Sequence, residues 1–142
     1  MQQWLAQLNL TERLGYAGLL PFVLTAMGVL LGIEGSEALF KLYSVVILAF
    51  MAGACWGALQ SMGEKAASID LFLSIGTSLW ALMIYFIPFA VAIPLLVIGY
   101  GLLLWLDTDS NVASHYNARY SYLRKVLTGV VISLHVLVFL FS

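Results

Sequence analysis

The feature that most constrains this chain is an uncharged stretch of thirty-six residues, from Leu71 to Leu106. As a single helix it would be about 54 Å long, whereas the hydrocarbon core of a bilayer is about 30 Å thick. Pro88 and Pro94 lie inside the stretch, where a tight turn between two spans would fall. We therefore expect two membrane-spanning helices here, joined by a hairpin.

Composition extends this prediction to the whole chain. Of the 142 residues, 63% are hydrophobic and 9% are charged, against about 25% charged in soluble domains. The apolar runs predict a single all-α transmembrane domain with five spans, at about 12–33, 38–62, 69–88, 90–106 and 121–141, and a cytoplasmic loop at 107–120. The formal net charge of −1 argues against a nucleic-acid partner, and the single cysteine, Cys55, excludes an intrachain disulfide.

The basic residues predict the orientation in the membrane. Five lie on the side that holds the N-terminus and the loop, and only Lys41 lies on the other side. The positive-inside rule then places the N-terminus in the cytoplasm and the C-terminus in the periplasm. We see no cleavable signal peptide and no Arg-rich amphipathic leader, so we expect the inner membrane of a bacterium. Three basic residues are expected to contact anionic lipid headgroups: Arg119, Arg124 and Lys125.

Small residues recur along one side of the first two spans, and such a stripe lets neighbouring helices approach closely in lipid. A proline within the first span also predicts a kink there. We expect spans one and two to pack through these residues. They are Gly18, Pro21, Gly28 and Gly32 in the first span and Ala49, Gly53 and Gly57 in the second.

One histidine, His135, lies inside the fifth span, and burying an ionisable group unpaired in lipid is costly. It could ligate haem iron, hydrogen-bond a quinone or relay a proton. It could equally be a neutral imidazole that a serine or tyrosine on a neighbouring helix satisfies. If a hydrophobic cofactor binds, we expect Trp56, Trp80 and Tyr85 to line its pocket with His135. The sequence assigns no particular cofactor.

Patterns for catalysis and metal binding are weak. The run Asp107-Thr-Asp109-Ser-Asn111 matches the first three ligand positions of an EF-hand loop, but Val112 and Ala118 occupy positions that need glycine and glutamate. We therefore predict a solvated loop without a metal. Every Asp and Glu lies at or beyond the end of a predicted span, so the usual groups for proton-coupled transport or acid–base catalysis are missing from the membrane. We predict that the protein is not an enzyme.

Four segments resemble a known family. They are Leu14-Gly-Tyr-Ala-Gly-Leu-Leu-Pro21-Phe22, Phe50-Met-Ala-Gly53-Ala-Cys55-Trp56-Gly57, Gly99-Tyr-Gly-Leu-Leu-Leu-Trp-Leu-Asp107 and Leu123-Arg124-Lys-Val-Leu127-Thr128. With them the chain resembles the small bacterial membrane proteins of unknown function that are related to the mitochondrial transmembrane protein sixty-nine. The resemblance implies five spans in an energy-coupling type of membrane, and it implies no reaction. Members of that family often have a histidine before the Trp-Gly pair, where this chain has Cys55.

Three functions follow from these observations. The leading one is an accessory, scaffold or assembly component of a larger membrane complex. In that role the protein binds a membrane-protein partner or copies of itself. The reason is that the predicted spans contain many small and aromatic residues and almost no titratable ones. The alternative is a binding module for a hydrophobic ligand such as quinone, haem or lipid. The third is an oligomeric small-solute channel. Its lining would be the polar side of the third span, with Ser74, Thr77, Ser78 and Tyr85.

Overall fold

The computed structural model describes residues 7–109 and 116–142, and within these ranges every regular element is helical. The elements are α2 (Leu10–Ala17), α3 (Leu19–Leu30), α4 (Ser36–Ser61), the 3-10 turn η1 (Gly63–Lys65), α5 (Ser68–Tyr85), α6 (Phe89–Asp109) and α8 (Ala118–Phe141). Five helical stretches are long and apolar enough to cross a membrane, with α2 and α3 together forming the first. The predicted all-α membrane bundle is therefore confirmed.

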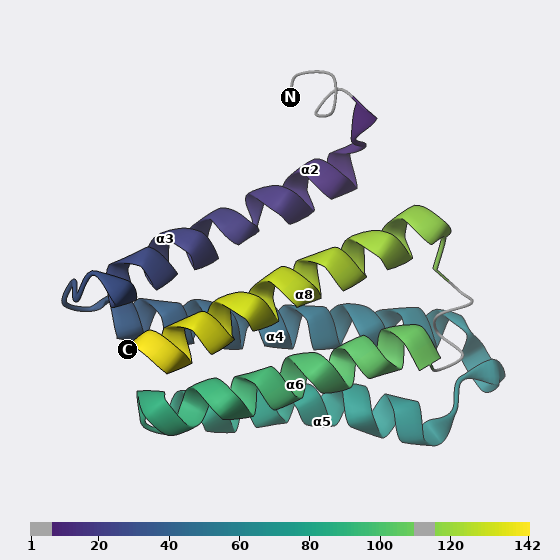
Figure 1. Ribbon diagram of the computed structural model, residues 1–142. Helices are drawn as coiled ribbons and strands as arrows, with labels where there is room; N and C mark the ends of the chain where they lie inside the picture. The colour runs from purple at the N-terminus through teal and green to yellow at the C-terminus, as the bar shows by residue number, and fades with distance from the viewer. Residues whose placement is uncertain (1–6, 110–115) are drawn as a thin grey trace.

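Successive spans run in opposite directions along the bundle (Figure 1). Because their number is odd, α2 begins at one end of the bundle and α8 ends at the other. The predicted hairpin falls between α5 and α6, in the turn that contains Pro88. Helix α6 continues past the predicted end of its span to Asp109, and α8 begins at Ala118. The segment between these helices is therefore shorter than the predicted loop.

Helix α4 lies at the centre of the bundle and packs against α3, α5 and α6. Its buried face repeats at helical spacing through Leu48, Ala52, Cys55 and Leu59, all of them fully buried. At the crossing with α6, a Cβ on Gly99 would lie 2.7 Å from a methyl carbon of Leu48. Because residue 99 has no side chain, the Leu48 side chain can pack between the two helices.

The first span is broken between α2 and α3, one turn before the proline that predicted a kink. Pro21 has no backbone N–H to bond the Ala17 carbonyl, and its ring crowds that carbonyl, so the regular helix ends at Ala17. At the break, the Tyr43 hydroxyl of α4 donates a hydrogen bond to the Gly18 carbonyl at 2.6 Å. A neighbouring helix thus satisfies a backbone group at the kink, as lipid-embedded helices require.

The small residues of the first two spans do not share one interface. Gly28 does lie against α4, because a Cβ there would overlap the Ser36 hydroxyl. Gly32 lies in the turn after α3 with a φ of 72°. Gly53 and Gly57 are exposed, and nothing lies within 4 Å of a Cβ built on either. The prediction that these two glycines pack against span one is wrong, because α4 buries the face that carries Leu48, Ala52 and Cys55 and turns the glycine face outward.

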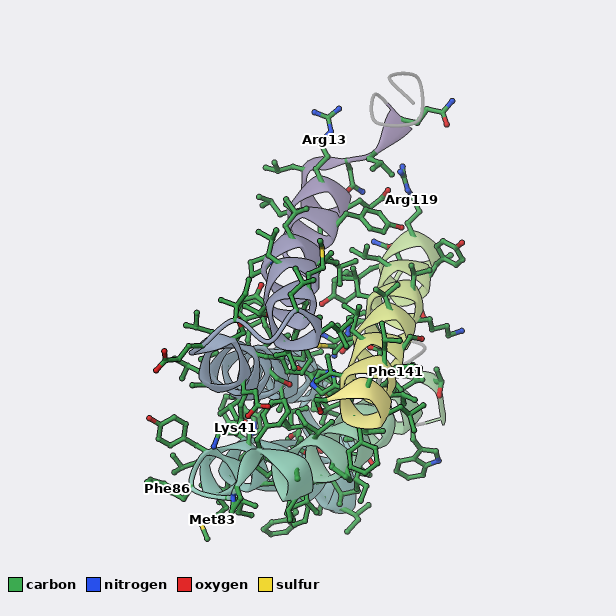
Figure 2. All side chains as sticks on the ribbon, turned by 60° about the vertical axis from the view of Figure 1, so that its left-hand side comes forward. Arg13, Lys41, Met83, Phe86, Arg119 and Phe141 are labelled. Carbon is green, nitrogen blue, oxygen red and sulfur yellow. The ribbon has the colours of Figure 1, made fainter. Side chains whose placement is uncertain are left out.

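Lys41, near the start of α4, links this helix to the α5–α6 turn at the end of the bundle opposite to the start of α2. Its Nζ donates to the Ile87 carbonyl in the α5–α6 turn at 2.9 Å and lies 5.8 Å from the centre of the Tyr85 ring. Met83 and Phe86 point away from the bundle at this end (Figure 2) and are 64% and 74% exposed. Large apolar side chains facing outward are what a bundle surrounded by lipid presents.

Candidate functional site

Helix α8 carries buried polar side chains at two levels, with Arg124 near its start and His135 near its end. The two residues are eleven positions apart, which is about 17 Å along a helix axis. Each has partners from other helices. We call the two groups the charged cluster (Arg124, Asp107, Tyr116 and Tyr120) and the neutral cluster (His135, Ser44 and Tyr100).

The charged cluster is built on an ion pair between α8 and the end of α6. Nη2 of Arg124 lies 2.7 Å from Oδ2 of Asp107, and Nε donates to the same oxygen at 2.9 Å. The two side chains are only 6% and 2% exposed. Nη2 also donates to the Met51 carbonyl of α4 at 3.4 Å. The ion pair therefore links α4, α6 and α8 at one level of the bundle.

Two tyrosine rings cover the guanidinium. The ring centres of Tyr116 and Tyr120 each lie 5.9 Å from Cζ of Arg124, within the range of a cation–π interaction. The Tyr116 hydroxyl donates to Oδ1 of Asp107 at 3.2 Å, so both carboxylate oxygens have a donor. Burial, and after it the neighbouring carboxylate, raises the pKa of Tyr116, which keeps this donor protonated at neutral pH.

The charged cluster corrects two predictions. The Arg124 guanidinium is buried in the ion pair, so it is not available to lipid headgroups. Asp107 is a buried residue of α6 and not part of a solvated loop, because the arginine compensates its charge inside the bundle. The EF-hand-like run therefore begins with a carboxylate that is already engaged. Residues 110–115 of that run lie outside the part of the chain that the structure describes.

The other two basic residues predicted at headgroups differ from each other. Nε of Arg119 lies 2.7 Å from Oε1 of Glu12, and its Nη2 donates to the Gln7 carbonyl at 3.1 Å. This contact joins the start of α8 to α2 near the protein surface, where Arg119 is labelled in Figure 2. Lys125 is exposed and has no ion pair among the described side chains.

The neutral cluster holds His135 where α3, α4, α6 and α8 meet. The residue is fully buried, and its ring centre lies 5.8 Å from that of Phe22, 4.7 Å from that of Phe40 and 5.3 Å from that of Tyr100. Its Nε2 is 2.6 Å from the Ser44 hydroxyl oxygen. Aromatic rings thus surround the imidazole on three helices, with one hydroxyl aimed at it.

The hydrogen bonds of His135 determine its tautomer. Nδ1 lies 2.7 Å from the Val131 carbonyl oxygen, which can only accept, so Nδ1 carries the proton. Nε2 then accepts a hydrogen bond from the Ser44 hydroxyl. The Tyr100 hydroxyl donates to the Ser44 carbonyl at 2.8 Å. A serine of a neighbouring helix is therefore the hydrogen-bond partner of the imidazole, as one of the alternatives left open by the sequence describes.

Between the two clusters lies Thr128, also on α8 and fully buried. Its hydroxyl has no hydrogen-bond partner within the described part of the chain. A buried hydroxyl without a hydrogen-bond partner lowers the stability of the fold, so Thr128 is a polar side chain that its packing environment does not satisfy.

The comparisons with known proteins can now be set beside this geometry. The model of the family described as "Protein of unknown function (DUF3429)" matches residues 9–140. The chain belongs to that family. No curated protein and no solved structure matches it.

In this DUF3429 protein, the four residues predicted to line a cofactor pocket are not gathered together. Only His135 is buried, whereas Trp56, Trp80 and Tyr85 are 39%, 40% and 45% exposed. The Trp80 indole donates to the Leu95 carbonyl of α6 at 3.1 Å. The rings that lie against His135 are those of Phe22, Phe40 and Tyr100, and none of the three exposed aromatic side chains.

The predicted polar side of α5 is divided between the interior and the surface of the DUF3429 bundle. Ser74 and Thr77 are buried, and their hydroxyls donate to the Leu71 and Leu73 carbonyls of the same helix at 2.9 and 2.7 Å. Hydroxyls in lipid commonly satisfy themselves in this way. Ser78 is half-buried and Tyr85 is 45% exposed, so the four polar side chains do not face one surface together.

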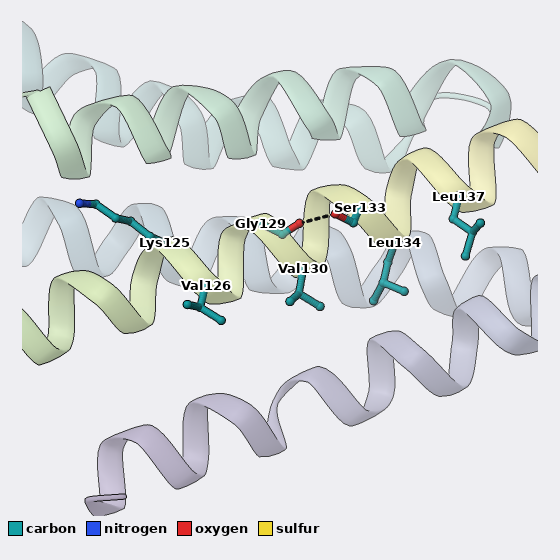
Figure 3. Close-up of a pocket in the computed structure, with 7 residues that line it drawn as sticks. All are labelled: Lys125, Val126, Gly129, Val130, Ser133, Leu134 and Leu137. Carbon is teal, nitrogen blue, oxygen red and sulfur yellow. Dashed lines mark hydrogen bonds between the residues drawn. The ribbon is translucent and has the colours of Figure 1, made fainter.

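A surface hollow opens between α4 and α5, and it has a volume of about 330 Å³. It is lined by Gly53, Trp56, Ser74, Ile75, Ser78 and Leu79. A second hollow, of about 620 Å³, lies along the outer face of α8 (Figure 3). Both are shallow and open to the side that lipid would occupy, so neither encloses a small molecule.

Sequence reasoning missed the partners of both clusters. Asp107 ends span four and Arg124 lies one turn inside span five, and these spans are neighbours joined by a short segment. That placement could have indicated the ion pair. Ser44 and Tyr100 gave no comparable signal, because each is one polar residue in an apolar run far from His135 in sequence. Only the packing of α4 and α6 against α8 brings them together.

Proposed function

We propose that this protein is a non-catalytic accessory or assembly component of a larger complex in the bacterial inner membrane. In this role it binds a transmembrane helix of a partner protein in the hollow between α4 and α5. The observation that carries the proposal is the open glycine face of α4, where nothing lies within 4 Å of a Cβ on Gly53 or Gly57.

The chemistry of this hollow suits a helix as its occupant. Small residues let two helix backbones approach closely, and hydroxyls can form hydrogen bonds across the interface. Gly53 supplies the space, and the half-buried Ser78 supplies a hydroxyl. Trp56 borders the hollow as a large aromatic side chain of the kind that anchors interfaces.

The buried polar groups support a structural role. Arg124, Asp107 and His135 all bond to groups of the same chain. The charged and neutral clusters are separated by about 17 Å along α8, so they cannot act on one substrate together. Groups that are engaged in this way position helices, and none of these three is free to act as an acid or a base.

The location in the proposal is supported by the sequence. Arg13, Lys65, Arg119 and Lys125 lie at the end of the bundle where α2 begins, and Lys41 lies at the other end. The positive-inside rule then favours a cytoplasmic N-terminus and a periplasmic C-terminus. The resemblance to bacterial relatives of the mitochondrial transmembrane protein sixty-nine supports an inner membrane.

Site-specific crosslinking in native membranes tests the proposal. A photoreactive amino acid at Leu79, in the hollow, is expected to form a discrete adduct, whereas one at Leu24, exposed on α3, is not. Gly53→Leu fills the hollow and should abolish the Leu79 adduct. Gly101→Leu is the matched control, because Gly101 is also an exposed helical glycine with open space around its Cβ.

The outcomes are distinct. If the adduct contains only a second copy of this chain, the hollow binds another copy in a homo-oligomer and not a partner protein. An adduct that Gly53→Leu leaves unchanged, or equal labelling from positions 79 and 24, would contradict the proposal.

A hydrophobic ligand in the same hollow is the second candidate, and Trp56 beside two serines favours it. A quinone or lipid could lie against the indole with a polar group near a hydroxyl. The optical spectrum and the organic extract of the purified protein test this candidate. Retained quinone that is lost in Gly53→Leu would support it, and a ligand-free extract would contradict it.

A further inference from the structure

We propose that the outer face of α8 is a binding site for one anionic phospholipid, whose headgroup phosphate pairs with Lys125 and whose acyl chain lies in the hollow below it. The proposal concerns a different face from the α4–α5 hollow and does not depend on the proposed function. It rests on the shape of the hollow, the charge at one end of it and its length.

The hollow has an apolar floor. It has a volume of about 620 Å³, and Gly129 leaves a gap in the helix surface at its middle. Figure 3 shows Val126, Val130 and Leu134 on the side of α8 that faces α2 and α3. Nothing lies within 4 Å of a Cβ built on Gly129, so this gap is open and is not filled by a neighbouring helix. The one hydroxyl in the lining, that of Ser133, already donates to the Gly129 carbonyl at 2.8 Å, so a saturated chain along this floor leaves it with a partner.

The charge lies at one end only. The Lys125 side chain extends back toward the start of α8 (Figure 3), as helical side chains do, which carries its ammonium toward the headgroup level. The other two basic residues near the start of α8 already have carboxylate partners, since Arg124 pairs with Asp107 and Arg119 with Glu12. Among these three cations, Lys125 is the one whose charge no described side chain compensates.

The hollow is long enough for an acyl chain of one leaflet. From Lys125 to Leu137 is twelve residues, or about 18 Å of helix, and half of a hydrocarbon core is about 15 Å. Because the Lys125 ammonium extends back toward the start of α8, a chain whose phosphate pairs with it ends before Leu137. A partner helix would not need a cation at one end and would cross the whole membrane.

Lipid retention by the full chain tests the proposal. The purified protein is delipidated in a neutral detergent and titrated with phosphatidylglycerol or phosphatidylcholine, and bound lipid is counted by native mass spectrometry. We expect one phosphatidylglycerol to bind in preference to phosphatidylcholine. Lys125→Gln should weaken phosphatidylglycerol binding about fivefold, the effect of one lysine near a membrane surface. Lys65→Gln, which removes a cation at the same end of the bundle but outside the hollow, should leave binding unchanged.

A second variant tests the acyl-chain position. Gly129→Leu places a side chain in the hollow, where its Cβ has no neighbouring atom within 4 Å, and should abolish retention, whereas Gly101→Leu on α6 should not. Far-UV circular dichroism confirms that each variant is folded. Equal retention of the two lipids, an equal loss in Lys65→Gln, or full binding by Gly129→Leu would overturn the proposal.

Discussion

The charged and neutral clusters lie equally far from the ends of α8, and yet they satisfy their polar groups in different ways. Arg124 is six residues after Ala118, and His135 is six residues before Phe141. Depth along the helix therefore does not explain the difference. At one end α6 supplies a carboxylate, whereas at the other end α4 supplies a hydroxyl and α8 itself supplies a backbone carbonyl.

This comparison shows that similar positions in a bundle can depend on their partners to very different degrees. Removing one partner of a buried ion pair leaves a full charge in a medium of low dielectric. Removing one partner of a neutral hydrogen bond leaves only a dipole unsatisfied, which costs less. Stability should therefore be far more sensitive to single substitutions in the charged cluster.

The largest expected effect is that of Asp107→Asn. It leaves the Arg124 guanidinium buried without its counterion and should lower the free energy of unfolding by about 3–5 kcal/mol. Unfolding in mixed SDS micelles, followed by far-UV circular dichroism, measures this. The paired replacement of Asp107→Leu with Arg124→Met should recover most of the loss, because no buried charge remains. If the paired variant is less stable than Asp107→Asn, the ion pair contributes more than charge compensation.

Next in size is His135→Leu in the neutral cluster. It leaves the Ser44 hydroxyl without its acceptor and should lower the free energy of unfolding by about 1–3 kcal/mol. Because the two side chains act as a pair, adding Ser44→Ala to this variant should cost little more. The same SDS titration gives all three values. A loss for His135→Leu as large as that for Asp107→Asn would remove the contrast between the clusters.

A smaller effect of opposite sign is expected at Thr128, between the clusters. Thr128→Val keeps the shape of the side chain and removes a buried hydroxyl that has no partner among the described residues. It should raise the free energy of unfolding by about 1 kcal/mol. A decrease would mean that this hydroxyl makes a hydrogen bond in the membrane, for example to water.

The smallest effect is expected for Arg119→Gln at the surface. In the Arg119–Glu12 pair the arginine side chain is 60% exposed and the glutamate side chain 10%. Water can therefore reach the place of the guanidinium beside the carboxylate, and the loss should be below about 1 kcal/mol. Added salt should reduce the difference further. A loss comparable to that of Asp107→Asn would show that the burial of Glu12 outweighs the exposure of its partner.

The sequence was sufficient to predict five membrane-spanning helices and the hairpin near Pro88, because apolar length and charge placement determine both. The break near Pro21 was also predictable, within one turn, from the missing N–H of the proline. In both cases the signal is local in the chain. For His135 the sequence offered a satisfied imidazole among several alternatives, and its partner Ser44 follows only from the packing of α4 against α8.

What could not be predicted depends on which face of each helix turns inward. The glycines of α4 indicated a packed face, but this chain buries the side with Leu48 and Cys55 and leaves Gly53 exposed. Arg124 was assigned to lipid because its distance from Asp107 follows only from the packing of α6 against α8. In an apolar chain most faces of a helix look alike, and small differences in shape between neighbours decide among them.

The contact between Leu48 and Gly99 has a consequence for how these proteins can diverge. The two positions occupy one shared volume, since any side chain at 99 would collide with the methyl groups of residue 48. A lineage that acquires alanine at 99 must accept a smaller residue at 48 to keep the helices at the same spacing. Substitutions at the two sites should therefore occur together among descendants, and the width of the gap between α4 and α6 should be inherited unchanged.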